Sequence, residues 1–307
     1  MTPRQLKYFI EIARSGSITT AANALHIAQP ALSHHIAAME EELDVVLFDR
    51  HARGVKLTVA GQRLLERATS ILRQMDRLKD DVQDASAQPR GLVSLCIVNS
   101  VSLILAAPLL RLLERRAPQV QLQLSSAMSR EAHALVEAGR VDLALLPTGA
   151  ESPRMQAIPA FEERLCLFGR QHLFGDARGP MPFREIGDRP LIAPDHHHDL
   201  RKMIERTALA QNCPLNVRYQ LSSADLLRSL VKAGLGFSIM PRNAFPDDEA
   251  RGIVVREIVD PDMVRTQSIV WMADHALTPA GEAVRNALLE LIAELIENGT
   301  LKARLLA

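Results

Sequence analysis

The spacing of hydrophobic residues divides the chain into three kinds of pattern. From residue 17 to residue 43, apolar residues recur three and four positions apart, as they do on one face of a helix. From residue 57 to residue 82 they follow a regular heptad spacing. Beyond residue 91, short apolar runs alternate with amphipathic segments, which is typical of strands alternating with helices. The sequence therefore predicts a helical N-terminal domain, one long helix and an α/β region.

Residues 17–43 have the pattern of two short helices joined by a tight corner. Ser17 can cap the first helix, and the pair Ala21 and Ala22 lets a second helix cross closely. The second helix is expected to begin at Gln29 and Pro30, because proline suits the first turn of a helix. The first helix should bury Ile18, Ala21, Ala22 and Leu25, and the second Leu32, Ile36, Met39 and Leu43.

The outer face of the second helix carries short or hydrogen-bonding side chains near its N-terminus. An amide such as that of Gln29 can pair with an adenine edge, and hydroxyl and imidazole groups can reach bases or phosphates in a major groove. The candidate DNA-binding residues on this helix are Gln29, Pro30, Ala31, Ser33, His34 and His35.

A basic hairpin is predicted directly after these helices. Residues 46–48 and 55–57 have the pattern of two short strands around Arg53 and Gly54. Arg50, Arg53 and Lys56 could then contact phosphates or a minor groove. An ordinary helical hairpin would explain residues 17–43 alone, but the basic hairpin that follows favours a winged helix-turn-helix.

The heptad pattern predicts a helix that begins at Leu57 and ends near Ala87. About thirty residues give a rod on the order of 45 Å, which is too long to bury its seam against one small domain. A second copy of the chain is the expected partner, although packing within one chain is an alternative. Such a homodimer would place two recognition helices about one DNA turn apart, for a dyad-symmetric operator. The seam consists of Leu57, Gly61, Leu64, Ala68, Ile71, Met75, Leu78 and Val82.

Beyond a hinge at residues 88–91, the alternation of strands and helices predicts parallel sheets with helices on both faces. Strands are expected at residues 92–98, 120–124, 141–146, 164–168, 190–193, 217–220, 237–240 and 266–272. Helices are expected at residues 102–116, 129–138, 200–210, 224–233 and 279–298. The late strand and closing helix should return to the first sheet, giving two lobes joined by two crossing strands. The predicted divisions are 1–58 for the winged helix-turn-helix, 59–87 for the linker helix, 92–163 with 266–300 for lobe I, and 164–265 for lobe II.

The segment from Leu6 to about Leu65 resembles, without a gap, the N-terminal signature of the LysR-type transcriptional regulators. Ala28 stands where the family commonly has a Ser or Thr cap, His34 stands where arginine is frequent, and no glycine follows Asp44. Residues 92–300 resemble the effector-binding region of the same family, which is similar to periplasmic binding proteins. The resemblance implies a transcription factor that is not an enzyme, acts as a homodimer or homotetramer, and has RNA polymerase as a further candidate partner.

In open sheets of this kind a ligand lies beyond the carboxyl ends of the strands, here between the lobes. Ser100 and Ser102 also open a helix, which suits an anion, and Arg201 could hold a carboxylate through a bidentate pair. A plain helix cap would explain Ser102 equally well. The candidate effector-binding residues are Asn99, Ser100, Ser102, Met128, Ser129, Pro147, Thr148, His198, Arg201, Leu226 and Phe237.

Composition limits the other classes of function. The chain has no net charge, and residues 1–90 carry twelve Lys or Arg against eleven Asp or Glu, so the DNA interpretation depends on where the charges lie. No segment has the length and hydrophobicity of a membrane span or a signal peptide. Three cysteines at Cys96, Cys166 and Cys213 have no metal-type spacing and suggest a reducing cytoplasm.

The remaining alternatives are a metal-responsive regulator, a redox-responsive regulator, and an enzyme or transport-type binding protein with an accessory DNA-binding domain. Residues His196 to His198 invite the metal interpretation, but three adjacent side chains rarely serve one ion. The chain has no nucleophile elbow and no Walker loop, and its Gly234 and Gly236 do not complete a dinucleotide fingerprint. We expect no catalytic residue, no metal and no cofactor, apart from a small-molecule effector.

Overall fold

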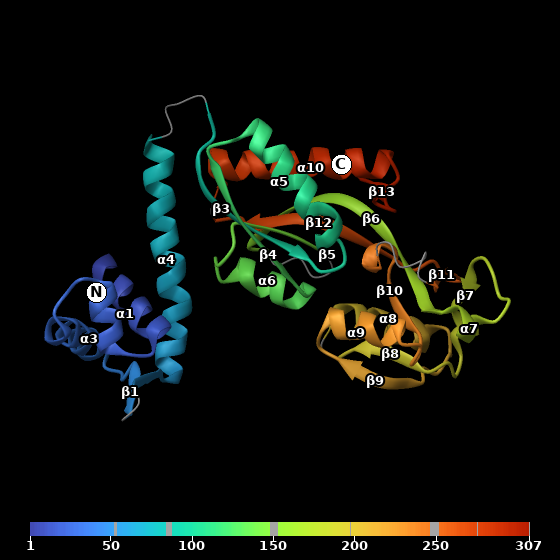
Figure 1. Cartoon of the computed structure of the whole chain (residues 1–307), viewed down its shortest axis with the longest axis horizontal. Coiled ribbons are helices and arrows are strands. Elements are labelled where there is room, and N and C mark those ends of the chain that lie inside the picture. The colour runs from blue at the N-terminus through green and yellow to red at the C-terminus, as the bar shows by residue number, and fades with distance from the viewer. Residues whose placement is uncertain are drawn as a thin grey trace. The chain divides into compact units, whose positions relative to one another are not determined.

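The chain forms two compact units: the first consists of Met1–Ala87 with Ala138–Arg140, and the second of Gln88–Glu137 with Val141–Ala307. The computed structural model describes residues 1–51, 54–83, 88–147, 153–196, 198–245, 252–274 and 276–306. Figure 1 shows the helices and strands of both units, which are described separately below. Within the described residues, no helix is both long enough and apolar enough to cross a membrane.

Three helices form the core of the first unit: α1 (Pro3–Ser15), α2 (Ile18–Ala24) and α3 (Gln29–Leu43). The Ser17 hydroxyl caps α2 by accepting a hydrogen bond from the amide of Thr20 at 3.3 Å. Ala21 and Ala22 are buried as predicted, and the small size of their side chains lets α3 pack closely. Leu32, Ile36 and Met39 are buried. The prediction for Leu43 was wrong: its side chain is 37% exposed, because the helix ends there and the next residue has a left-handed backbone.

The wing consists of two antiparallel strands, β1 (Phe48–His51) and β2 (Gly54–Leu57). The predicted first strand at residues 46–48 begins two residues too early. The reason is a local anchor: the carboxylate of Glu40 accepts hydrogen bonds from the amides of Leu47 and Phe48, at 2.7 and 3.3 Å. These bonds hold the chain against α3 until β1 begins.

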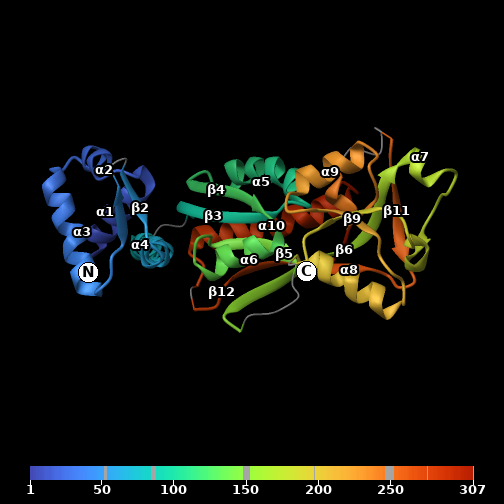
Figure 2. The same ribbon diagram turned by 90° about the horizontal axis from the view of Figure 1, so that it is seen from below.

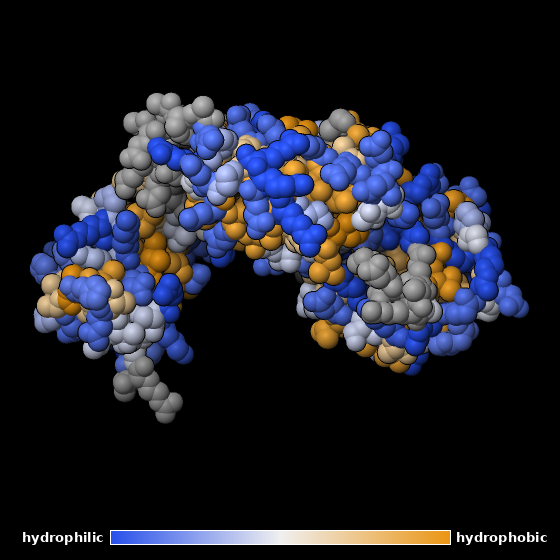
Figure 3. Space-filling model, turned by 45° about the horizontal axis from the view of Figure 1, so that its top comes forward, coloured by the Kyte–Doolittle hydropathy of each residue, from blue (hydrophilic) through white to orange (hydrophobic). Residues whose placement is uncertain are grey.

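The long helix α4 spans Val59–Gln83. It begins two residues later than predicted, because Leu57 belongs to β2 and Thr58 lies at the start of the helix, where its hydroxyl accepts a bond from the Gly61 amide. The first part of the predicted seam packs on the three-helix core, where Ala68 is fully buried and Leu64 is partly buried. Further along, Ile71 and Met75 are 41% and 38% exposed, and part of the surface in this region is orange in Figure 3.

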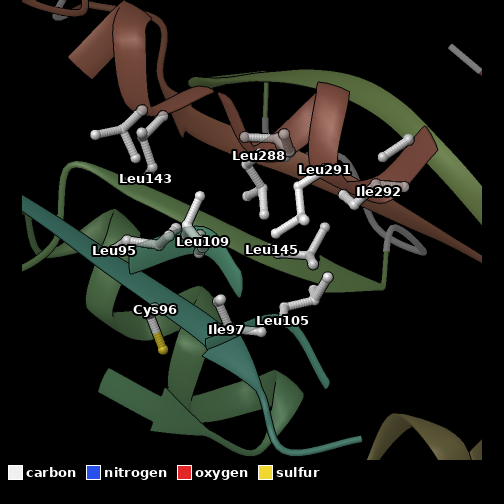
Figure 4. Close-up of a cluster of buried hydrophobic side chains, with 14 of the residues drawn as sticks. Leu95, Cys96, Ile97, Leu105, Leu109, Leu143, Leu145, Leu288, Leu291 and Ile292 are labelled. Atoms are coloured by element: carbon white, nitrogen blue, oxygen red, sulfur yellow. The ribbon is translucent and has the colours of Figure 1, made fainter. Parts of the chain in front are cut away.

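Lobe I of the second unit is a sheet covered by helices on both faces. Its elements are β3 (Gly91–Val98), α5 (Ser102–Arg116), β4 (Val120–Ala127), α6 (Ser129–Glu137), β5 (Leu143–Pro147), β12 (Val264–Met272) and α10 (Pro279–Glu297). Helices α5 and α10 cover one face and α6 the other (Figure 1). Because successive side chains of a strand point to opposite faces, Leu95 and Ile97 join the core beneath α5 and α10, while Cys96 points away from it (Figure 4).

Lobe II has its own buried core. Its elements are α7 (Gln171–Phe174), β7 (Met181–Pro182), β8 (Leu191–Pro194), α8 (Asp199–Ala210), β9 (Val217–Leu221), α9 (Ala224–Lys232), β10 (Ser238–Pro241) and β11 (Ile253–Val259), with 3-10 turns η1 (Phe183–Ile186) and η2 (Arg242–Ala244). The long strand β6 (Met155–Arg170) runs from lobe I, where it pairs with β12, into lobe II, where it pairs with β10 and β11 (Figure 2). The short strand β13 (Arg304–Leu305) also pairs with β6.

The prediction of parallel sheets was only partly right. Strands β3, β4 and β5 are parallel, as are β8 and β9. Strand β12 is antiparallel to both β5 and β6, and β10 and β11 are antiparallel to β6. The sheets are mixed because β6 and β12 pass between the lobes in opposite directions.

Candidate functional site

The N-terminal half of α3 presents an exposed polar face. Gln29, Pro30, Ala31 and His34 are exposed, and Ser33 is half-buried. The side-chain amide of Gln29 donates a hydrogen bond to the Ser33 hydroxyl at 3.0 Å, so the two groups form a pair one turn apart. Both groups are small, polar and free to exchange this bond for a base edge.

His35 faces another direction. It is half-buried, and its ring lies 5.2 Å from the ring of Tyr8 on α1, centroid to centroid. Packing between α3 and α1 therefore explains the partial burial of the His35 side chain. At the start of α3, Ala28 provides no side-chain cap, so the first amides of the helix remain suited to an anion such as a phosphate.

The wing adds exposed cations near these helices. Arg50 on β1 and Lys56 on β2 are exposed, and Lys56 pairs in register with Asp49. Arg53, the third predicted wing residue, lies outside the described residues. Long cationic side chains on a two-stranded hairpin are suited to phosphates rather than to reading base edges.

A second candidate site is a cavity of about 50 Å³ in the second unit, between the two lobes. It is lined mostly by apolar side chains, with a few polar groups among them, as is usual for small-molecule sites. Its lining consists of Val98, Asn99, Ser100, Ala127, Met128, Ser129, Pro194, His198, Leu200, Ala224, Leu227, Arg228, Met240, Pro241, Ala244 and Arg265.

The N-terminal ends of four helices meet at this cavity. Lining residues lie at or just before the first turns of α5, α6, α8 and α9. Helix N-termini carry partial positive charge and unpaired amides, which attract anions. At α5 the residue before the helix, Val101, supplies no side-chain cap. The backbone therefore favours negative charge in the cavity.

Two arginines add full positive charge to the cavity lining. Arg265 donates from Nε and Nη2 to the same Glu163 oxygen, at 2.9 and 2.8 Å. Arg228 donates to the Ala244 carbonyl at 3.0 Å and to the exposed Asp225 at 2.7 Å. Neither acid lines the cavity, and no aspartate or glutamate is among its described lining residues. The positive ends of both pairs therefore face the cavity.

His198 is a neutral polar group of the lining. Its Nδ1 accepts a hydrogen bond from the amide of Leu200 at 3.2 Å and so caps α8. Burial lowers the pKa of His198 below its ordinary value, and the nearby positive charge of Arg265 lowers it further, against the opposing effect of Asp199 and Asp195.

The structure brings five of the predicted effector residues together around the cavity: Asn99, Ser100, Met128, Ser129 and His198. It does not place Ser102, Pro147, Leu226, Phe237 or Arg201 in the lining. Thr148 lies outside the described residues.

The other five residues have different surroundings, and Pro147 lies at the end of β5, in register with Gln267 of β12. Ser102 donates to the carbonyl of Asn99, at 3.5 Å, and Leu226 is exposed while its neighbour Leu227 faces the cavity. Phe237 is buried in lobe II against Phe174. Arg201 is 5% exposed and donates from Nε to Glu205 at 2.7 Å.

Sequence reasoning missed the two arginines of the lining. Arg265 lies in β12 opposite Glu163 in β6, and the two are register partners. An acidic and a basic residue on two apolar segments could have indicated an ion pair between neighbouring strands. The predicted strand began only at residue 164, however, so Glu163 was left outside it. Arg228 lies on the predicted helix at residues 224–233, one turn from its start, and no local pattern favoured it over Leu226.

The described cysteines have features of structural thiols. Cys96, Cys166 and Cys213 are buried and free of disulfides. Burial raises the pKa of the Cys96 thiol, and it raises the pKa of Cys166 to about 12, so neither is a thiolate at neutral pH.

The histidine run does not form a described metal site. His196 lies 3.4 Å from the carboxylate of Glu205, whereas His198 caps α8. His197 lies outside the described residues. Over the part of the chain that the structure describes, no three His, Cys, Asp or Glu side chains are grouped closely enough to hold an ion.

Comparison with known proteins assigns both units to one family. Residues 3–62 match the model of the bacterial regulatory helix-turn-helix protein, lysR family, and residues 86–293 match the LysR substrate binding domain. The chain belongs to the LysR family of transcriptional regulators. It is 30% identical to the HTH-type transcriptional regulator BbuR of Bordetella bronchiseptica, over 86% of this chain and 82% of that protein.

Other LysR relatives agree over nearly the whole length. The dual regulator OxyR of Escherichia coli is 26% identical over 94% of this chain and 95% of its own. Among solved structures, full-length OxyR C199D from Pseudomonas aeruginosa has a TM-score of 0.70 at 24% identity, covering 95% of this chain and 94% of that one. Full-length CbnR complexed with its target DNA has a TM-score of 0.70 at 22% identity, covering 96% and 99%. This LysR-family chain is thus a DNA-binding transcriptional regulator and not an enzyme, with a helix-turn-helix domain and a two-lobed α/β domain.

Proposed function

We propose that this regulator works in the cytoplasm as a homodimer, assembling further to a tetramer, and binds a dyad-symmetric operator. A small anionic metabolite in the cavity between the lobes would control its action on transcription, and RNA polymerase is a further proposed partner. The proposal of an anionic ligand rests on the lining of the cavity. Two arginines and four helix N-termini contribute to it, and its described lining residues include no aspartate or glutamate.

The exposed face of α3 supports the operator part of the proposal. Gln29 and Ser33 lie on the part of the helix that would enter a major groove, and Arg50 and Lys56 would contact the DNA backbone. The solved structure of CbnR with its target DNA gives a precedent within the family for a chain of the same fold.

Helix α4 supports the dimer. Its first turns pack on the helix-turn-helix core, but Ile71 and Met75 leave apolar side chains exposed on the same seam. Covering them with the same seam of a second copy would remove this apolar area from water. A twofold dimer would also present two copies of α3 to two half-sites of one operator.

Redox control is a second candidate, since some relatives are named hydrogen peroxide-inducible genes activators, at 24% to 26% identity. The surroundings of the cysteines disfavour it for this chain. A peroxide-sensing thiol needs thiolate character and access to solvent, whereas Cys96 and Cys166 are fully buried with raised pKa values.

The operator part is tested by selecting bound duplexes from a randomised DNA pool with the full-length chain. We expect enrichment of an inverted repeat whose half-sites lie about one helical turn apart. A pool that stays unenriched, or that yields a single unpaired half-site, would contradict the proposal.

A further inference from the structure

A buried network connects the cavity to the strands that join the lobes. At its centre lies Glu163 on β6, whose side chain is fully buried. Its Oε1 accepts hydrogen bonds from Arg265 and, at 2.6 Å, from Gln267, and its Oε2 accepts one from Asn243 at 3.3 Å. Burying a carboxylate is costly unless it is paired and hydrogen-bonded, and these donors offset that cost.

The network reaches two further segments. Asn243, on η2, donates to the carbonyl of Lys302 at 3.2 Å and accepts from its amide at 2.9 Å. Arg265 donates from Nη2 to the hydroxyl of Ser100, in the loop before α5, at 2.9 Å. One set of hydrogen bonds thus includes β6, β12, η2, the C-terminal segment and the cavity loop.

Within this network, Arg265 is the charged group that faces the cavity. Arg265 is 9% exposed and lines the cavity, whereas Glu163 is completely buried behind it. Glu163 accepts hydrogen bonds from the Nε and Nη2 atoms of Arg265, which form one edge of the guanidinium. The hydroxyl of Ser100 is the weaker partner of Nη2, because a neutral acceptor binds a cation less strongly than a carboxylate does. An incoming carboxylate would therefore replace Ser100 and leave Glu163 in place.

The size and lining of the cavity restrict the rest of the ligand. A volume of about 50 Å³ corresponds to roughly four water molecules. Apart from the arginines, His198, Asn99 and the two serines, the lining is apolar. A short carboxylate with an apolar body fills such a space, while a phosphate would leave the apolar wall without a partner.

Building on the proposed function, we propose that Arg265 recognises the ligand's anionic head, that Glu163 positions its guanidinium, and that the ligand is a short carboxylate with an apolar body. Because Arg265 and Glu163 are register partners on the two crossing strands, occupancy of the cavity acts directly on the connection between the lobes.

The test measures the binding of isobutyrate and of isobutyramide, its uncharged analogue, to the full chain by thermal shift titration, with inorganic phosphate as a third probe. We expect the wild type to prefer the carboxylate by about tenfold or more, which is the contribution of one charged hydrogen-bonding pair. Arg265→Gln should reduce that preference by about tenfold, leaving the part that Arg228 and the helix N-termini supply. Arg201→Gln is the matched control, since it removes an equally buried, carboxylate-paired arginine outside the cavity lining.

Two further variants keep the test valid if Arg265→Gln fails to fold with Glu163 left unpaired. Glu163→Gln alone retains the cation but removes the carboxylate that orients it, so its preference for isobutyrate should fall below that of the wild type and stay above that of Arg265→Gln. A preference equal to that of the wild type would overturn the positioning role of Glu163. The double variant Glu163→Gln with Arg265→Gln replaces the ion pair with two amides and should show the same reduced preference as Arg265→Gln.

The outcomes separate this inference from the proposed function. A carboxylate preference as large as that of the wild type in both Arg265 variants would overturn the role of Arg265 and leave the cavity as the ligand site. Stronger stabilisation by phosphate than by isobutyrate would overturn the ligand class. If neither isobutyrate nor phosphate stabilises the wild type more than isobutyramide does, the anionic ligand of the proposed function fails, and this inference with it.

Discussion

Gln29 and Ser33 lie one turn apart on the exposed face of α3 and are hydrogen-bonded to each other in the DNA-free chain. Replacing either with alanine should cost roughly 1 to 3 kcal/mol of binding free energy on a specific operator and little on random DNA, because base-edge contacts carry sequence information. Titrations of both DNAs with each variant measure the difference. Equal losses on the two DNAs would remove these side chains from base reading.

Lys56 on the wing provides the matching control. Its exposed ammonium is expected to contact phosphate, so Lys56→Ala should weaken binding to both DNAs and reduce the slope of affinity against salt by about one unit. Loss confined to the specific operator would instead assign Lys56 to base recognition.

His198 should make stability depend on pH. Its pKa in the folded chain is lowered from 6.5, first by burial, so the unfolded chain takes up the proton first as the pH falls. The contribution of His198 to stability is therefore complete above the ordinary histidine pKa and declines as the pH falls below it. It stops declining once the pH is below the folded-state pKa.

The variant His198→Asn isolates this effect, because asparagine can still cap α8 but does not titrate. Denaturant unfolding of the full chain between about pH 7.5 and pH 5 should show a smaller loss of stability in the variant than in the wild type. Identical pH profiles would show that His198 does not titrate differently on folding.

Arg201 and Arg265 show where sequence reasoning succeeds and where it stops. Both lie near the ends of predicted strands, and Arg201 was chosen as a bidentate partner for a carboxylate in a segment expected to face the cleft from lobe II. Which side of α8 faces the cavity depends on how lobe II packs on lobe I, and this is set by contacts between residues distant in sequence. Asn99, Ser100, Met128 and Ser129 were found because they follow strands directly, where position in the sequence is enough.

The proposed dimer rests on the exposed apolar side chains of helix α4. Ile71→Asp would place a charge on the exposed seam, where a twofold dimer would bring it against its own symmetry mate in a desolvated interface. Sedimentation should then show monomers, and operator binding should collapse. Gln62→Asp puts the same charge on an exposed position of α4 outside the seam and should remain dimeric. An Ile71→Asp chain that stays dimeric would remove α4 from the interface.

Gly61 sets how closely α4 approaches the helix-turn-helix core. A Cβ at this position would lie 2.2 Å from the backbone carbonyl oxygen of Leu47, a contact that only a shift of the backbone can relieve. Gly61→Ala should therefore destabilise the chain by about 1 to 3 kcal/mol, despite the higher helix propensity of alanine. Chemical denaturation measures the change in the free energy of unfolding, and Gln62→Ala, at an exposed neighbouring position, is the control. A stabilised Gly61→Ala chain would contradict the packing.

At the level of elements, periodicity predicted most helices and short strands. Its failures have a physical cause. Strand β6 was predicted only from residue 164, because Glu162 and Glu163 interrupt its apolar pattern, and the burial of Glu163 depends on partners in β12 and η2. Strand β11 was missed because Arg256 and Glu257 interrupt it in the same way. Long-range ion pairs and hydrogen bonds hide such strands from local patterns.

For the molecule as a whole, the family resemblance was visible in the sequence, since the gapless match from Leu6 to about Leu65 overlaps residues 3–62, which the helix-turn-helix model matches. The ligand could not be deduced in this way. It depends on a cavity whose walls come from both lobes and whose two arginines were not predicted.

Binding of a carboxylate in the cavity is expected to change how the full chain binds its operator. The most direct measurement is a footprint and binding titration on the operator selected from random DNA, with and without saturating isobutyrate. We expect a change in affinity or in the length of protected DNA for the wild type and for Arg201→Gln, and no change for Arg265→Gln. Superimposable titrations and footprints for the wild type, with isobutyrate shown to be bound, would contradict it.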